Sequence, residues 1–126
     1  MTATRRAALV LQAWCGLAWF DAVHMVTRRV AIDALPKVAT PAAPAIACDE
    51  VVAAFETAAC LYWKPVLCLQ RSICMVRLLR GVGVPAKLVI GYRCRPFASH
   101  AWVEVAGRVV NDSAVYADRL KVLYVG

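Results

Sequence analysis

The segment 81–85, GVGVP, divides the chain into two parts with different hydrophobic patterns. Before it, apolar residues recur at the three- and four-residue spacing of helices, and after it they alternate with polar residues as in strands. The patterns predict one long helix or two short ones over 5–35, helices over 50–63 and 68–80, and strands over 86–93, 99–105, 108–112 and 121–125. Helices followed by antiparallel strands indicate an α+β domain, with the sheet packed on the central helix 68–80.

Prolines and one acidic residue mark the boundaries within the first part. Pro36 ends the first helical region, and the proline-rich stretch 37–47 is typical of a connecting loop. Asp49 is expected to cap the N-terminus of the next helix. A length of 126 residues suits one domain, so we expect a single domain over 1–126. Its helical region and loop would take up 1–47 and its core 48–126.

The composition is basic and unusually apolar. The chain has 15 Lys and Arg against 8 Asp and Glu, a net charge of +7, and 62% of its residues are hydrophobic. The arginines are scattered in pairs, which indicates either a solvated positive surface or attraction to an acidic partner. No nucleic-acid-binding motif accompanies the charge, so we expect no nucleic-acid partner. The apolar surplus indicates buried helices, a partner surface or membrane contact.

The N-terminus resembles an export signal, because two arginines precede an apolar run. The run contains Trp14 and Trp19, breaks at Asp21 and is followed by no small-x-small cleavage site. It is also shorter than a membrane span and is interrupted by Gln12. We therefore interpret it as a docking helix of a cytoplasmic protein, with membrane association as the less favoured alternative.

The six cysteines, at 15, 48, 60, 68, 74 and 94, form no CxxC pair and no cluster with metal-ligand spacing. We therefore expect no metal and no other cofactor. Cysteines within apolar helical patterns usually pack as small hydrophobic residues in a reducing compartment. Five of the six are interpreted in this way, and Cys68 is the exception.

Cys68, His100 and Asp112 form a candidate catalytic triad. Cys68 opens a predicted helix after the break at Lys64–Pro65, whereas His100 and Asp112 lie on two neighbouring predicted strands. A carboxylate orients the imidazole, and an imidazolium and a helix N-terminus both favour the thiolate of a cysteine nucleophile. Each residue alone also has an ordinary explanation, respectively as a core cysteine, a strand histidine and a turn former.

The register of the predicted hairpin decides whether His100 and Asp112 share a sheet face. A three-residue loop ending at Gly107 places His100 opposite Asp112 and Trp102 opposite Val110, on one face. A two-residue Ala-Gly loop shifts the register by one and separates His100 and Asp112 onto opposite faces. We favour the first register because Ala-Gly is a poor two-residue turn. Trp102 would then be a candidate wall of a substrate cleft, although a strand tryptophan more often belongs to a core.

Several ordered motifs resemble the lasso-peptide leader peptidases of the transglutaminase-like, papain-related superfamily. They are CLxRS from Cys68, LLRGVGVPAKLVIGYR over 78–93, PFxxHAWVEV from Pro96, Gly107, and VND over 110–112. Together they are specific and cover roughly residues 50–112. The resemblance implies a transglutaminase-like fold in which Cys68 is the nucleophile, His100 the general base and then acid, and Asp112 the orienting carboxylate.

The resemblance also implies a substrate and partners. Such an enzyme removes the leader from a ribosomally made precursor peptide, and a separate ATP-dependent, asparagine-synthetase-like cyclase then closes the ring. Only 67 residues, predicted to be mostly helical, precede Cys68, so the chain looks like the split form that needs a separate leader-recognition protein. Two alternatives stay open. One is a transamidase or amidase on the same fold, and the other is an inactive scaffold that presents the precursor to the cyclase.

Overall fold

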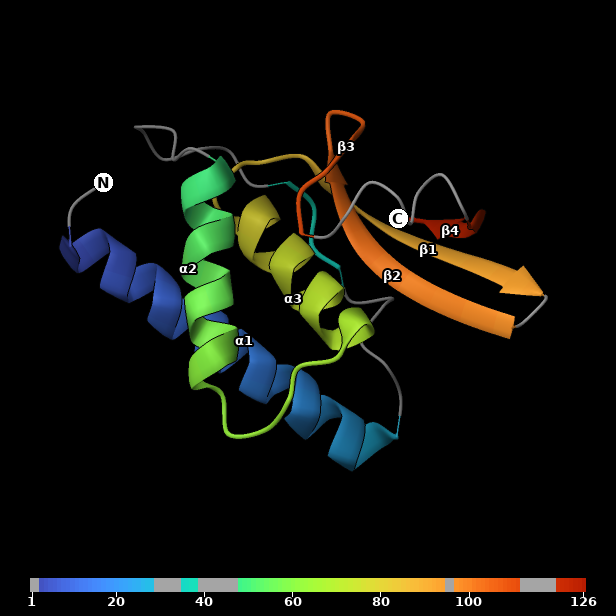
Figure 1. Ribbon diagram of the computed structural model, residues 1–126. Helices are drawn as coiled ribbons and strands as arrows, with labels where there is room; N and C mark the ends of the chain where they lie inside the picture. Colours follow the sequence, from blue (N-terminus) through green and yellow to red (C-terminus); the bar gives the residue numbers. More distant parts are fainter. Residues whose placement is uncertain (1–2, 29–34, 39–47, 95–96, 112–119) are drawn as a thin grey trace.

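Three helices cover one side of a four-stranded antiparallel sheet (Figure 1). The computed structural model describes residues 3–28, 35–38, 48–94, 97–111 and 120–126. The helices are α1 (Ala3–Thr27), α2 (Cys48–Leu61) and α3 (Cys68–Gly81), and the strands are β1 (Ala86–Cys94), β2 (Phe97–Val105), β3 (Arg108–Val109) and β4 (Lys121–Val125). The strand order is β3-β2-β1-β4. The predicted α+β architecture is confirmed.

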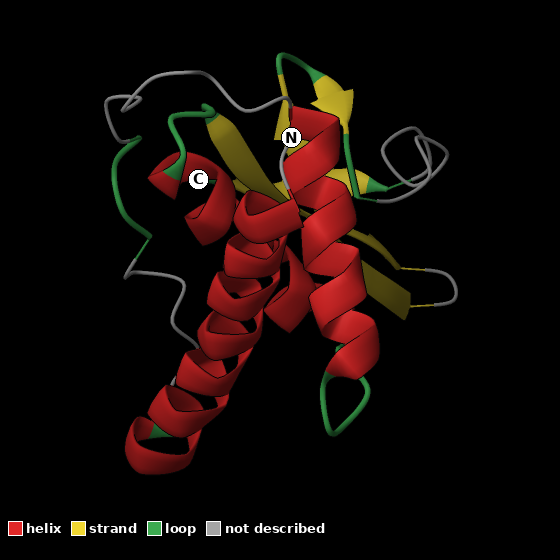
Figure 2. Ribbon diagram, turned by 90° about the vertical axis from the view of Figure 1, so that its left-hand side faces the viewer, coloured by secondary structure: helices red, strands yellow, loops and turns green. Residues whose placement is uncertain are grey.

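Helix α3 lies at the centre of the domain, where it contacts α1, α2, β1 and β2. In Figure 2 the helices lie in front and the strands behind them. A helix with apolar residues on most of its sides is stable only where other elements cover those sides, which explains the central position of α3. The buried residues of α3 are Gln70, Ser72, Ile73, Cys74, Met75, Val76 and Leu79.

The two faces of the β1–β2 hairpin have different neighbours. Leu88 and its β1–β2 partner Val103 are buried in the core that the helices share. Successive strand residues point to opposite faces, so Trp102 and His100 project from the other side of β2. That other face is also closely packed, because Trp102 and its partner Val89 are buried.

The predicted β2–β3 register is wrong by one residue. Glu104 pairs with Val109 and Val105 with Arg108, which leaves a two-residue turn at Ala106 and Gly107. Both turn residues have positive φ, 52° and 77°. This is the conformation of a type I′ turn, whose twist matches that of the two strands, so strand geometry overrides the unfavourable alanine. The register therefore does not set His100 opposite Asp112 or Trp102 opposite Val110.

Other predicted boundaries also differ from the structure. Strand β3 ends at Val109 rather than at 112, although the Val110 N–H still donates to the Val103 carbonyl at 3.0 Å. Helix α1 ends at Thr27, where Arg28 takes a φ of 58°, and residues 29–34 of the predicted first helix lie outside the described residues. Helix α2 begins at Cys48, so Asp49 lies in the first turn instead of capping it. There it still favours the positive end of the helix dipole.

Candidate active site

Cys68 is the first residue of α3, as predicted. Leu67 before it is extended, with φ −80° and ψ 164°, and no side chain in the described part of the chain caps the helix. The first helical hydrogen bond runs from the Arg71 N–H to the Leu67 carbonyl at 2.9 Å. The N–H groups of the first turn have no carbonyl partner within a helix, so they can stabilise a thiolate or an oxyanion. The half-buried Cys68 packs at the margin of the core.

His100 lies on β2 opposite Gly91 of β1 and is half-buried. Its ring stacks on that of Trp102, with centroids 6.3 Å apart and planes at 24°. The Trp102 ring in turn lies directly against Gly91. A Cβ atom added at this glycine would be only 2.7 Å from Trp102 Cη2. Trp102 is therefore packed beneath His100, and its buried Nε1 has no hydrogen-bond partner among the described residues. This burial favours a role in positioning His100, while direct contact of Trp102 with substrate stays a prediction.

Asn111 is a further residue of this region that the sequence did not reveal as important. Its Oδ1 accepts a hydrogen bond from the Val103 N–H at 2.8 Å, where the β2–β3 ladder ends. Its Nδ2 donates to Oγ of Ser72 at 3.2 Å, and Ser72 is buried one turn after Cys68. The two bonds attach the end of the hairpin to the first half of α3. Two signals could have revealed it: an amide closing an apolar strand, and a serine on the helix face that carries Cys68.

The members of the candidate triad are described to different extents. Cys68 and His100 belong to elements that contact each other, α3 and β2, although His100 lies on the face of β2 opposite the one that carries Val103 into the core shared with the helices. Asp112 lies outside the described residues, but it directly follows Asn111, which is bonded to α3. The meeting of the three side chains stays a prediction.

The segment leading into Cys68 is anchored to α1 through Asp21. The Tyr62 hydroxyl donates to one oxygen of Asp21, and Lys64 Nζ lies 2.9 Å from the other. Lys64 Nζ also donates to Oε1 of Gln70 at 3.4 Å, in the first turn of α3. Burial raises the pKa of Asp21, but hydrogen bonds from Tyr62, Lys64 and Gln70 outweigh it and hold that pKa below its usual value. Burial and the bond to Asp21 raise the pKa of Tyr62 to about 12.

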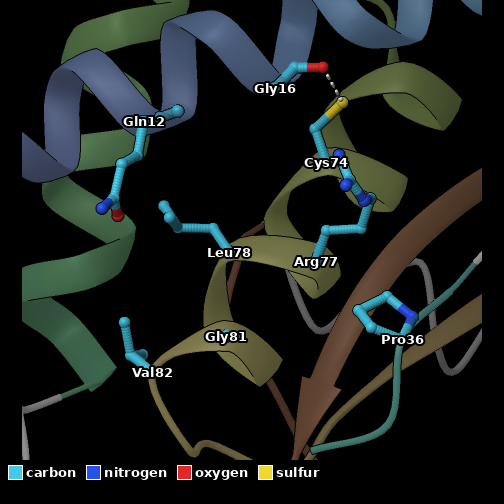
Figure 3. A pocket seen from close by; sticks show the side chains of 9 residues that line it. Gln12, Gly16, Pro36, Cys74, Arg77, Leu78, Gly81 and Val82 are labelled. Atoms are coloured by element: carbon cyan, nitrogen blue, oxygen red, sulfur yellow. Dashed lines mark hydrogen bonds between the residues drawn. The ribbon is translucent and has the colours of Figure 1, made fainter. Parts of the chain in front are cut away.

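The other cysteines occupy varied environments, so their interpretation as core residues is correct only in part. Cys74 is buried, and its thiol donates to the Gly16 carbonyl at 3.6 Å (Figure 3). Burial raises the pKa of the Cys74 thiol to about 12. Cys15, Cys60 and Cys94 are exposed, because they lie on the outward faces of their elements. All six thiols are free.

A cavity of about 410 Å³ lies between α1 and α3, away from Cys68. Its walls include Cys74 and Arg77 on α3 and Gln12 on α1 (Figure 3). Arg77 lies half a helical turn from the side of α3 that carries Cys68, and its guanidinium stacks on Trp19 at 3.7 Å. This cavity is therefore separate from the candidate triad.

Comparisons with known proteins agree with the α+β architecture and the motifs. The family model of the transglutaminase-like superfamily matches residues 7–125. The Microcin J25-processing protein McjB of Escherichia coli is 46% identical to the chain over 56 residues, which make up 44% of this chain and 27% of that protein. The match thus spans little more than a quarter of that relative. No solved structure matches the chain.

Proposed function

The chain belongs to the transglutaminase-like superfamily, and on that premise we propose that it is a cysteine peptidase that removes the leader from a lasso-peptide precursor. The observation that carries the proposal is the position of Cys68, at the uncapped start of a central helix. The similarity to a Microcin J25-processing protein supports a role in peptide processing.

In the proposed reaction, the Cys68 thiolate attacks the scissile carbonyl after His100 has taken the thiol proton. The free N–H groups at the start of α3 would stabilise the oxyanion. His100 then returns the proton to the leaving amine, and water releases the leader acid from the thioester. Asp112 would hold the imidazole in the required tautomer. Trp102 beneath His100 and Asn111 beside Ser72 would hold the two strands in place.

We further propose the partners that the resemblance implies. They are the precursor peptide, a separate leader-recognition protein and an asparagine-synthetase-like cyclase. We also propose that the reaction takes place in the cytoplasm and that residues 1–126 form a single domain. The net charge of +7 would favour acidic segments on these partners.

Mass analysis of products tests the proposal. The protein is incubated with a precursor and its recognition protein, and we expect the leader to be released with one water added. Cys68→Ala should abolish release, whereas Cys60→Ala, which removes an exposed cysteine of α2, should not. Asp112→Asn and His100→Ala should keep the fold and lower the rate by ~10²-fold or more.

The two alternatives give different outcomes. Transfer of the acyl group to an added amine would indicate a transamidase. An intact precursor, combined with alkylation of Cys68 no faster than that of Cys60, would indicate a scaffold. Full activity of Asp112→Asn would remove Asp112 from the triad.

A further inference from the structure

The outward side of α1 bears no charged residue between Thr4 and Val26. Arg5, Arg6, Asp21 and His24 all lie on other sides of the helix. Large apolar side chains on this side are strongly exposed: Leu11 by 64%, Met25 by 75% and Val26 by 83%. A surface helix normally turns a polar face to water, so an apolar outer face indicates that something covers it.

The outer face has the spacing of a helix–helix seam. Its residues fall into two series of seven-residue spacing, which together give the 3.5-residue period of a coiled coil. One series is Ala8, Cys15 and Ala22, and the other is Thr4, Leu11, Ala18 and Met25. Except for the half-buried Ala18, all of these residues are exposed.

The seam is complementary to itself, and we propose that it pairs with the same seam of a second copy of the chain in antiparallel orientation. The register that sets Ala8 opposite Met25 also sets Ala22 opposite Leu11. Each large side chain then lies over an alanine, which is the arrangement that fills a helix interface without voids. A parallel pair would set each alanine against itself and leave gaps.

The end of α2 supplies an independent reason for this arrangement. Leu61 and Trp63 are 67% and 72% exposed although they adjoin the core. The Leu61 carbonyl accepts a hydrogen bond from Trp14 Nε1 at 3.4 Å, so Leu61 lies beside Trp14 of α1. The two-fold axis of the proposed pair crosses α1 about 4 Å from Trp14 along the helix. It would therefore bring the exposed ends of the two α2 helices together.

An apolar groove beside the seam would receive the second copy. The groove has a volume of about 560 Å³ and lies between α1 and α2, with Ala7, Leu11, Trp14 and Leu61 among its lining residues. In the proposed register, Met25 of the second copy lies level with Ala8, at the edge of this groove. Its long, flexible side chain suits an irregular apolar space.

A membrane surface fits the outer face less well. Among the described residues, α1 is the one helix long and apolar enough to cross a membrane, so the expectation that this apolar run is shorter than a membrane span is wrong. Interfacial helices, however, insert large aromatic side chains. Here Trp14 instead packs on Tyr62, with ring centroids 5.2 Å apart, and Trp19 packs on Arg77. The outer face is left without an aromatic anchor, and its alanines favour close approach of another helix.

Light scattering across a dilution series tests the proposal. The wild-type protein should change from twice the monomer mass to the monomer mass on dilution. Ala22→Leu sets two leucines against each other and Leu11→Ala leaves a gap, so each should weaken association ~10-fold or more, equivalent to ~1.4 kcal/mol. The double variant Leu11→Ala/Ala22→Leu exchanges large and small residues and should restore association. Ala53→Leu, at an exposed position of α2 away from the seam, is the control.

All substituted positions are exposed, so circular dichroism should show unchanged folding. A wild-type protein that stays monomeric at every concentration overturns the proposal, and binding of that monomer to phosphatidylglycerol vesicles would assign the face to a membrane. A dimer that both single variants leave intact, or that the double variant fails to restore, also overturns it. Cys68→Ala should dimerise like the wild type, which separates this test from that of the proposed function.

Discussion

Replacing Asn111 by alanine tests the link between the hairpin and α3. The substitution removes the acceptor of the Val103 N–H and the donor to Ser72 Oγ, and both Val103 and Ser72 are fully buried. Leaving one buried polar group without a partner costs about 1–3 kcal/mol. Asn111 itself is half-exposed, so water can reach part of the gap, and we expect a total loss of about 2 kcal/mol. In a domain of this size the loss lowers the melting temperature by about 8 °C.

Denaturant unfolding of Asn111→Ala, Ser72→Ala and the double variant measures the coupling of the two side chains. Ser72→Ala alone should cost about 1 kcal/mol, and the double variant should cost less than the sum by about 0.5–1 kcal/mol. Thr57→Ala is the control, because its hydroxyl bonds to the Ala53 carbonyl on the surface of α2. A loss for Asn111→Ala no larger than that for Thr57→Ala would refute the reasoning.

Three further substitutions probe other features of the fold. Gly91→Ala places a Cβ 2.7 Å from Trp102 Cη2 and 2.9 Å from Leu120 Cβ, so it should destabilise the fold by about 1–3 kcal/mol in denaturant unfolding. Ala106 has a φ of 52°, in the left-handed region, which asparagine tolerates better than alanine does. Ala106→Asn should therefore stabilise the fold by about 0.5–1 kcal/mol, and a loss of stability would contradict the turn assignment. Cys74 should resist alkylation at pH 8 until the chain unfolds, whereas Cys15 and Cys94 react. Because burial raises the pKa of Cys74 to about 12, its contribution to stability is complete below the ordinary thiol pKa of about 9 and is lost as pH rises toward 12. Alkaline unfolding of Cys74→Ala should therefore start at higher pH, and an unchanged profile would count against this explanation.

Sequence patterns were sufficient to predict the helices and the long strands, but not the register of the β2–β3 hairpin. The 3.6- and 2-residue periods placed all three helices and the long strands, because burial on one or both faces imposes those periods. The hairpin register failed because it depended on one turn. The left-handed conformation of Ala106 costs roughly 1–2 kcal/mol. The chain adopts it nevertheless, because the twist of this turn matches that of the two strands.

The candidate site was predicted unevenly for a similar reason. The start of α3 at Cys68 follows from local signals, namely the Lys64–Pro65 break and the apolar run after it. The bridge from Asn111 to Ser72 joins residues 39 positions apart, and the anchor from Asp21 to Tyr62 joins residues 41 apart. No local pattern encodes such pairings, since they depend on how the helices and the sheet pack.

The two-residue turn at Ala106–Gly107 limits how this surface loop can vary. Exposed turns usually tolerate insertions, because few contacts depend on their length. Here one added residue, if the turn keeps its two-residue form, would slide the segment after the turn by one position along β2 and direct the Asn111 side chain to the opposite face of the sheet. Asn111, which directly precedes Asp112 in the chain, would then lose its hydrogen bond to Ser72. Related chains should therefore vary in the identity of these two residues and keep their number.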